Sequence, residues 1–436
     1  MNTLCAAIAR CDITPPLGTL LFGYPSERRG NVVADGLNAT ALVLQSGEET
    51  AVVIALDWAV LDEEETAAIG AAISDATGIS ARHVTLCCSH THSGPPTVTA
   101  WGWSKKDVPY LEEMRARIAE IVAQAQKNLQ PVRIGIGVGT TDAGINRREI
   151  HPDGSVHLGF NESGPRDDSL SVVRFEGENG TVAGLVHLSA HPTSRGLEPS
   201  ISRDWPGVMM DRLETITGAT TLFINGSFGD VAPRTTIGGV VGDGEIAARE
   251  VGLRAANDAI AVWREIKDWR DMDLNVHLGE FQMPHSPLAS REDAGKYLEE
   301  HPHDAEKLGE PGAEWNYWNA VQKAHCATLQ SSRTFRQTLT RIGPLVIVPF
   351  GGEIFSDIAL RLKKASPFAH TLCAGSTNGS HGYYVTREAR ARGGYEVWVA
   401  RAFSPYLLAD NIDDVLVQEN LQLLQQLAEK NKSTPE

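Results

Sequence analysis

Several features typical of membrane-spanning and nucleic-acid-binding proteins are missing from this sequence. No hydrophobic run approaches the roughly 20 residues that a membrane-spanning helix needs. Positive charge is scarce, because 39 Lys and Arg stand against 55 Asp and Glu and leave a formal net charge of -16. A surface field of this sign repels nucleic acid and anionic membranes. We therefore expect no nucleic-acid partner, no stable membrane insertion and a small-molecule ligand, while the oligomeric state stays open.

Signals for export and for disulfide bonds are also lacking. The N-terminus, MNTLCAAIARCDITPPLG, has no basic region followed by a long apolar stretch. None of the six cysteines belongs to a CxxC pair. We expect a cytoplasmic chain whose cysteines are reduced residues of the core.

The sequence does contain a succession of short apolar strands and amphipathic helices. Residues 39–58 predict two strands joined at 46–49, and residues 63–78 predict a helix closed by a glycine. The alternation of strands and helices recurs from Ser169 onwards. Because the sequence has neither an exact repeat nor a linker, we predict a single α/β domain over residues 1–430. Residues 286–332 are more charged and lack strand-like alternation, which predicts a helical insertion or a lid.

Two histidines follow a predicted buried strand. Val84 to Cys88 is β-branched and apolar, and TLCCSHTHSGPPT places His90 and His92 at its exit. In an extended chain, side chains at i and i+2 point to the same side, roughly 6.6 Å apart, so both imidazoles should face one cavity. Two interpretations stay open: hydrogen-bonded histidines that cap a strand end, or a metal or catalytic role.

Further polar residues follow other predicted strands. His191 ends the apolar strand of GLVHLSAHPTS, and Pro192 favours an extended backbone at that histidine. Glu353 follows a strand and a Gly-Gly break, where the alternative is an acidic residue in the first turn of a helix. Residues 376–397 form a loop rich in Gly and Tyr, which indicates either a binding wall or packed loop aromatics.

Six ordered motifs then carry a resemblance: SHTHSGP, GINRRE at 144–149, AHPTS, ISRDWPG at 201–207, INGSFGDVAPR at 224–234 and the Gly/Tyr loop. Over about residues 7 to 400 the chain resembles the neutral/alkaline ceramidase family. Members of that family are zinc-dependent amidases that cleave the N-acyl bond of ceramide. The resemblance implies layered mixed sheets flanked by helices around a central metal-containing pocket, within a mixed α+β variant of the α/β class.

The resemblance also assigns site residues. It implies zinc ligands at His90, His191, Glu353 and Tyr383, and a reaction centre lined by His92, Arg147 and Tyr395. The chemistry is consistent, because two imidazoles and a carboxylate leave a zinc coordination position open for a water whose pKa falls to about 7. His92 would then pass a proton to the leaving nitrogen, and Arg147 and Tyr395 would stabilise the oxyanion. Without the resemblance, a surface salt bridge is the preferred role for Arg147.

The chain departs from the family in ways that bear on its substrate. It lacks the secretion signal and the C-terminal immunoglobulin-like domain of the long ceramidases, and Ala232 stands where they have a serine once proposed as catalytic. The motif segments add Arg195, Arg203 and Arg234, whose guanidinium groups suit carboxylates or phosphates rather than alkyl chains. The alternative is that these arginines pair with the acids Asp204, Glu198 or Asp230 and do not face the substrate.

These observations favour a zinc amidase that acts on the N-acyl bond of a small polar substrate through a zinc-activated water. The alternatives are a zinc lactonase or esterase acting on a small polar metabolite, a true ceramidase, and a metal-binding protein without catalytic activity.

Overall fold

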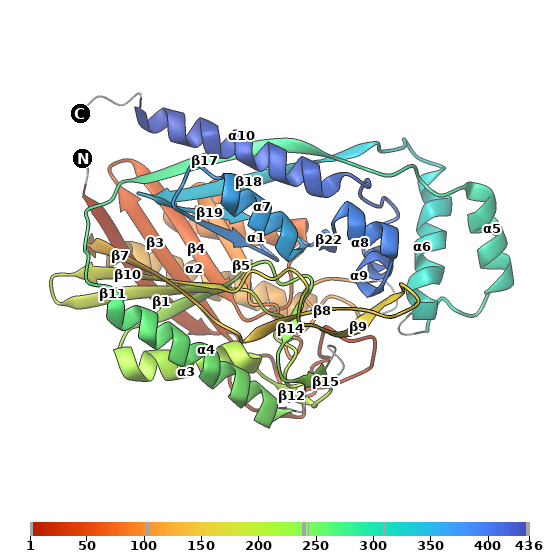
Figure 1. The fold of residues 1–436 in the computed structure, drawn as a ribbon, viewed down its shortest axis with the longest axis horizontal. Helices are drawn as coiled ribbons and strands as arrows, with labels where there is room; N and C mark the ends of the chain where they lie inside the picture. Colours follow the sequence, from red (N-terminus) through yellow and green to blue (C-terminus); the bar gives the residue numbers. More distant parts are fainter. Residues whose placement is uncertain (1–2, 101–103, 238–240, 243, 308–309, 433–436) are drawn as a thin grey trace.

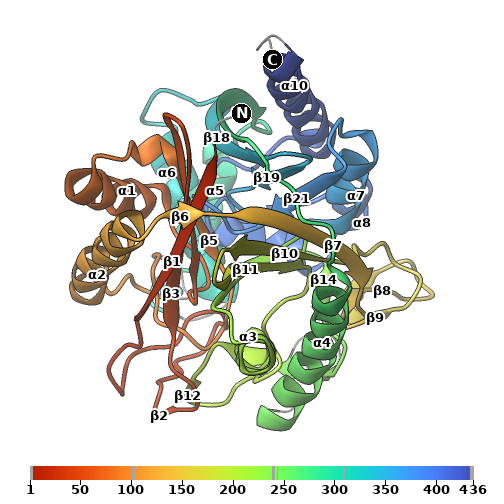
Figure 2. The same cartoon turned by 90° about the vertical axis from the view of Figure 1, so that its left-hand side faces the viewer.

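Three β-sheets form the centre of the molecule, and helices cover their outer faces (Figures 1 and 2). The computed structural model describes residues 3–100, 104–237, 241–242, 244–307 and 310–432. Mixed sheets flanked by helices confirm the predicted fold class. Within the described residues, no helix combines the length and the apolar character that crossing a bilayer requires.

The first sheet has the strand order β5-β4-β3-β1-β6 and carries the first two helices on one face. Its elements are β1 (Leu4–Asp12), β3 (Asn38–Ser46), β4 (Glu49–Leu56), β5 (Val84–Cys88), β6 (Gln130–Pro131), α1 (Glu63–Thr77), α2 (Val108–Lys127) and the 3₁₀ turn η1 (Ala81–His83). The predicted strand pair and helix are confirmed. Asp62 caps the N-terminus of α1 by accepting from the Glu65 backbone, and Gly78 ends it at a φ of 74°.

The second and third sheets have the strand orders β13-β11-β10-β7 and β17-β18-β19-β21. The second consists of β7 (Arg133–Thr140), β10 (Ser169–Gly177), β11 (Gly180–Leu188) and β13 (Thr221–Asn225), with α3 (Asp204–Thr217) and α4 (Glu245–Glu265) outside. The third consists of β17 (Leu274–Pro284), β18 (Ser332–Ile342), β19 (Leu345–Pro349) and β21 (His370–Ala374), with α7 (Ser356–Ala365) and α10 (Ile412–Lys432).

The same supersecondary unit occurs once in each main sheet. An antiparallel strand pair is followed by a helix and by a strand parallel to the second of the pair: β3-β4-α1-β5, β10-β11-α3-β13 and β18-β19-α7-β21. A helical crossover brings the next strand back in parallel, so the carboxyl ends of both strands lie at one edge of the sheet. The loops that leave these edges carry the candidate site.

The inner faces of the three sheets meet in one apolar core. Leu42, Phe175 and Ile347 come from different sheets, belong to the same cluster and are almost completely buried. Burying a side chain of this size contributes roughly 1.5–3 kcal/mol. Separate apolar clusters bind helices to the outer faces. The sheets are therefore held together at the centre, and the loops at their edges rest on a rigid base.

The remaining elements are four small groups of paired strands and several further helices. The strands are β2 (Val32–Val33) paired with β12 (Ser200–Ile201), β8 (Gly144–Ile150) with β9 (Val156–Asn161) and β14 (Val231–Pro233), β15 (Thr236–Ile237) with β16 (Val241–Gly242), and β20 (Glu353–Ile354) with β22 (Tyr383–Tyr384). The helices are α5 (Arg291–Glu300), α6 (Glu310–Ala324), α8 (Arg387–Arg392), α9 (Tyr395–Val399) and the 3₁₀ turn η2 (Ala400–Ala402).

Residues 286–332 contain the helices α5 and α6, which lie at one end of the molecule (Figure 1). Glu314 of α6 accepts from Arg401 at 2.5 Å and from the Trp398 indole at 3.2 Å. The pair of helices therefore rests against the segment that begins with α9. A role as a lid stays a prediction.

All six cysteines are free. Cys87, Cys88 and Cys373 are buried, whereas Cys326 is exposed. The expectation that every cysteine belongs to the core is therefore wrong for Cys326, which lies two residues after the end of α6.

Candidate metal and catalytic site

His90 and His92 lie just after β5, and their rings meet with centroids 5.0 Å apart. The extended backbone predicted for this stretch is wrong, because His90 has a φ of 72°, in the left-handed region. The two imidazoles therefore converge because the backbone turns at His90, and not because they lie at positions i and i+2 of a strand. The His90 amide donates to the Trp58 carbonyl at 2.9 Å, and its Nδ1 donates to the Ala59 carbonyl at 2.8 Å. The loop after β4 thus fixes the ring.

His191 lies three residues beyond β11 and is completely buried. Its Nδ1 faces the carbonyls of Phe228 at 2.7 Å and Val231 at 3.1 Å. The Trp205 indole donates to the His191 carbonyl at 2.9 Å. Because Nδ1 is the donor in both His90 and His191, Nε2 carries the lone pair in each neutral ring.

Glu353 belongs to the short strand β20, whose parallel partner β22 places it opposite Tyr383. The alternative of a first-turn helical acid is wrong, because α7 begins only at Ser356. The Glu353 Oε2 atom lies 2.9 Å from His191 Nε2 and 3.5 Å from His90 Nε2. Burial raises the pKa of Glu353.

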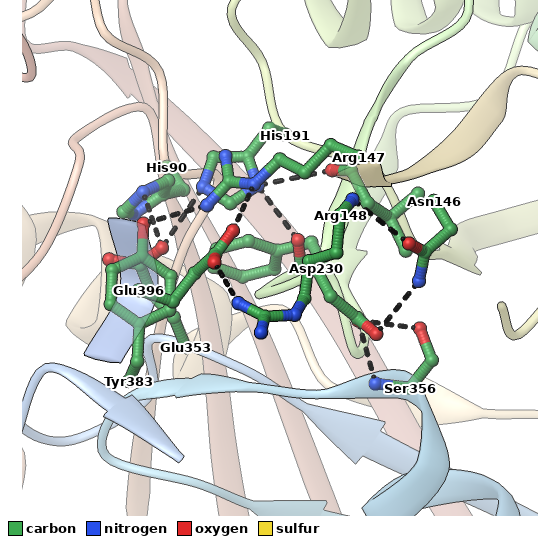
Figure 3. A network of polar contacts seen from close by, with 12 residues as sticks. His90, Asn146, Arg147, Arg148, His191, Asp230, Glu353, Ser356, Tyr383 and Glu396 are labelled. Atoms are coloured by element: carbon green, nitrogen blue, oxygen red, sulfur yellow. Dashed lines mark hydrogen bonds and ion pairs between the residues drawn. The ribbon is translucent and has the colours of Figure 1, made fainter. Parts of the chain in front are cut away.

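Tyr383 and Arg147 complete this cluster (Figure 3). The hydroxyl of Tyr383 hydrogen-bonds the Glu353 carboxylate and accepts from Arg147 Nη2 at 3.0 Å. The neighbouring Tyr384 instead meets His381 Nδ1 at 2.6 Å. Burial holds the pKa of Tyr383 well above its usual value. Tyr383 is therefore the tyrosine of this pair that reaches Glu353.

Arg147 is buried rather than part of a surface salt bridge, so the role preferred from the sequence alone is wrong. Only 5 % of the residue is exposed, and its Nε donates to Glu396 Oε1 at 2.9 Å. Tyr395 opens α9 and places its ring centroid 6.3 Å from that of Tyr383 and 5.8 Å from the Arg147 guanidinium carbon. Arg147 and Tyr395 thus lie beside Tyr383, the residue that hydrogen-bonds Glu353.

A metal ion fits the donor atoms that converge here. His90, His92 and His191 each offer one nitrogen, and these nitrogens lie within 4.8 Å of one another. Burial lowers the pKa of His90 to about 4 and that of His191 well below its usual value, so both rings are neutral. Their Nε2 lone pairs then face a carboxylate. A proton on Glu353 could be donated to only one of the two Nε2 atoms, whereas a cation could accept the lone pairs of both nitrogens and of the carboxylate.

His92 differs from the two other histidines. Its ring meets those of His90 and His191 at 5.0 and 5.9 Å, but its Nδ1 is buried and finds no hydrogen-bond partner within the described chain. Gly23 lies against the ring, because a Cβ at that glycine would stand 2.3 Å from His92 Cγ. A metal-binding histidine usually donates its second ring nitrogen to a hydrogen-bond acceptor, as His90 and His191 do. His92 differs from them because its Nδ1 has no such partner in the described chain.

Comparison with known proteins identifies the architecture. No protein-family model matches the sequence, and no curated protein does. Among solved structures, the neutral ceramidase from Pseudomonas aeruginosa is similar with a TM-score of 0.72 and 18% identity, over 98% of this chain and 75% of that chain. A ceramidase complexed with C2 is similar with a TM-score of 0.74 and 18% identity, over 99% of this chain and 76% of that one. The chain has the neutral ceramidase fold. At this identity the likeness concerns the fold and leaves the activity to be argued from the site.

Within this ceramidase fold, the three additional arginines are engaged by acidic side chains. Arg195 Nη1 lies 2.8 Å from Glu198, Arg203 pairs with Asp35 at 3.0 Å and with Asp211 at 2.8 Å, and Arg234 Nη1 lies 3.1 Å from Glu162. These ion pairs favour the alternative in which the arginines bind acidic side chains of the protein rather than an anionic substrate. Each finds its counter-ion within its own loop or on an adjacent segment.

Sequence reasoning missed several residues that shape the site of this ceramidase fold. Phe228 packs against His90 and His191 with ring centroids 4.7 and 4.9 Å away, and Tyr24 meets His92 edge-on at 5.0 Å. Phe228 lies inside a motif already recognised, so the motif itself was the available signal. No sequence signal marked Gly23 or Glu396, because glycines in loops and acidic residues in short helices are common.

Proposed function

We propose that the protein is a zinc-dependent hydrolase that cleaves an amide (N-acyl) bond. The observation that carries the proposal is the convergence of His90 Nε2 and His191 Nε2 on one oxygen of Glu353, at 3.5 and 2.9 Å. In this proposal His90, His191, Glu353 and Tyr383 hold the ion. Nitrogen and oxygen donors of this kind suit zinc. When bound, zinc lowers the pKa of a water and polarises a carbonyl.

His92 is proposed as the group that moves the proton. Its ring faces both proposed histidine ligands, and its Nδ1 has no competing partner in the described chain. An amide nitrogen leaves poorly unless it is protonated, so a general acid at this place contributes typically 10²–10⁴-fold. A histidine with an unused nitrogen supports amide cleavage over the cleavage of an ester with a good leaving group.

Arg147 and Tyr395 are proposed to stabilise the oxyanion that develops on the carbonyl oxygen. Arg147 donates from Nε to Glu396 and from Nη2 to Tyr383. A guanidinium has five N–H donors, so these two hydrogen bonds leave others available. The Tyr395 ring lies 5.8 Å from the Arg147 guanidinium carbon and 6.3 Å from the Tyr383 ring, so its phenol is proposed as the second donor. Donors placed in advance in a site shielded from water are worth about 10²–10³ in rate each.

A zinc lactonase or esterase remains the second candidate, because it would use the same ion and the same oxyanion donors. Arg195, Arg203 and Arg234, which favoured a small polar substrate, pair with acidic side chains of the protein. The size and polarity of the acyl group are therefore matters for experiment.

The test compares matched substrates with purified protein that has been loaded with zinc. One series pairs N-acyl amides with esters of the same acyl group, from short N-acyl amino acids to a long-chain ceramide in detergent, and a second contains hydroxy-acid lactones. We expect turnover of amides, and a larger loss for amides than for activated esters in His92→Ala. Turnover of esters or lactones alone would favour the second candidate, and no zinc-dependent turnover would contradict the proposal.

A further inference from the structure

Two neighbouring arginines, Arg147 and Arg148, share a single buried carboxylate, that of Glu396 (Figure 3). We propose that Glu396 is a positioning residue, which acts on the reaction through Arg147 and holds that guanidinium against Tyr383. The inference rests on the proposed function, in which Arg147 stabilises the oxyanion.

The contacts form one continuous chain. Arg148 is anchored by the backbone carbonyls of Gly393 at 2.7 Å and Ala389 at 3.4 Å, and its Nη1 donates to Glu396 Oε2 at 2.5 Å. The other oxygen, Oε1, accepts from Arg147 Nε at 2.9 Å. With Nε engaged on one side, Arg147 presents Nη2 to Tyr383 Oη at 3.0 Å.

Burial and charge make this arrangement depend on Glu396. Arg147 is 5 %, Arg148 8 % and Glu396 1 % exposed. Both guanidinium groups bind the same carboxylate, so two positive charges lie close together away from water. Removing the carboxylate between them leaves an uncompensated pair of like charges, which favours rotation of Arg147 out of the site. Arg148 keeps its backbone anchors and is the less free to move.

Glu396 acts at one remove from the reacting atoms. Within the described residues its carboxylate accepts from the two arginines, while Arg147 is the member of this series of contacts that reaches Tyr383. Because α9 begins at Tyr395, the same short helix supplies the proposed oxyanion phenol and the carboxylate that orients the arginine. One helix therefore sets both donors relative to each other.

The experiment measures kcat, KM, zinc content and thermal unfolding of Glu396→Gln and Glu396→Asp, with the amide turned over by the wild type. Glu388→Gln is the control, since Glu388 is an exposed acid on α8 that pairs with Arg392. A misplacement of about 1 Å in a catalytic group costs about 10²-fold. We expect a kcat loss of this size in Glu396→Gln with KM and zinc content unchanged, partial recovery in Glu396→Asp, and wild-type kinetics in the control.

A double-mutant cycle separates positioning from general damage. If Glu396 acts through Arg147, Glu396→Gln should cost less than about twofold when introduced into Arg147→Met. A full 10²-fold further loss in that background would overturn the proposal. Wild-type kcat in a folded Glu396→Gln protein would overturn it as well.

A crystal structure of Glu396→Gln gives a readout that needs no activity. The expected result is an Arg147 guanidinium displaced from Tyr383, with Arg148 still on the carbonyls of Gly393 and Ala389. An unmoved Arg147 would contradict the inference even if the proposed function is correct. Full activity in Arg147→Met would instead contradict the oxyanion role and, with it, positioning for catalysis.

Discussion

His191 and Glu353 are 162 residues apart in the chain, yet His191 Nε2 lies 2.9 Å from Glu353 Oε2. Their side chains are 0 % and 7 % exposed, so water does not solvate the pair. Burial alone raises the pKa of Glu353 and lowers that of His191, which disfavours an ion pair between them. A cation bound by the two side chains offsets this cost.

Purified protein should carry about one zinc per chain, as counted by elemental analysis. His191→Ala should lose the metal and remain folded by circular dichroism, because it deletes a donor whose orientation two backbone carbonyls fix. His92→Ala should keep the metal, which distinguishes the proposed set of His90, His191, Glu353 and Tyr383 from a three-histidine set. Full zinc occupancy in His191→Ala would be incompatible with the assignment.

Catalysis should require His92 and not Ser227. Ser227 is completely buried, and its Oγ lies 3.4 Å from that of Ser189. Ser227→Ala should leave kcat/KM within about tenfold of wild type, whereas His92→Ala should lose at least 10²-fold, the loss expected for a general acid. An inactive Ser227→Ala protein with normal zinc content would point to a serine nucleophile instead.

Gly23→Ala should reduce activity without removing zinc. Gly23 has a φ of 112°, and a methyl group there would lie 2.3 Å from His92 Cγ, so the imidazole must shift. Gly18→Ala is the matched control, because Gly18 has a φ of 86° and nothing within 4 Å of an added Cβ. Both variants should lose about 1 kcal/mol or more of stability from backbone strain. Equal activity in the two variants would show that the contact with His92 is unimportant.

Stability should fall on acidification in part through His187. Burial lowers the pKa of His187 to about 4, with Lys363 as the second cause, and its Nε2 meets the Cys373 carbonyl at 3.0 Å. The unfolded chain binds this proton below about 6.5 and the folded protein only below about 4. The stabilisation is therefore complete above pH 6.5 and is lost as pH falls towards 4.

Between pH 7 and pH 5 this group should account for about 2 kcal/mol of lost stability. His187→Gln keeps a donor for the carbonyl and removes the titration, so its denaturant unfolding should depend less on pH over that interval. The buried carboxyls of Asp57, Asp204 and Asp230, whose pKa values burial raises to about 6, contribute with the opposite sign in both proteins and cancel in the comparison. An identical pH dependence in both proteins would contradict the prediction.

Local patterns were sufficient for much of the secondary structure and for where the histidines enter the site. The β3–β4 pair and helix α1 follow from alternation and capping residues that lie within a few positions of each other. His90 and His191 follow apolar strands, which the sequence displays directly. The backbone of His90 was not predictable in the same way, because a left-handed φ at a histidine depends on hydrogen bonds to the loop after β4.

The sign of the net charge, the alternation of strands and helices and the residue types able to bind a metal follow from composition and short-range spacing. Which of those residues meet depends on the packing of segments that are distant in the chain. His90, His191 and Glu353 leave three different sheets, and their convergence depends on how the sheets pack around their shared core. The same packing gave Arg147 a buried partner in Glu396 while Arg195 and Arg234 found acids elsewhere. Arg195 meets Glu198 only three residues along the chain, whereas Arg147 and Glu396 are 249 residues apart. Sequence spacing carries no record of the distance between segments that are so far apart in the chain.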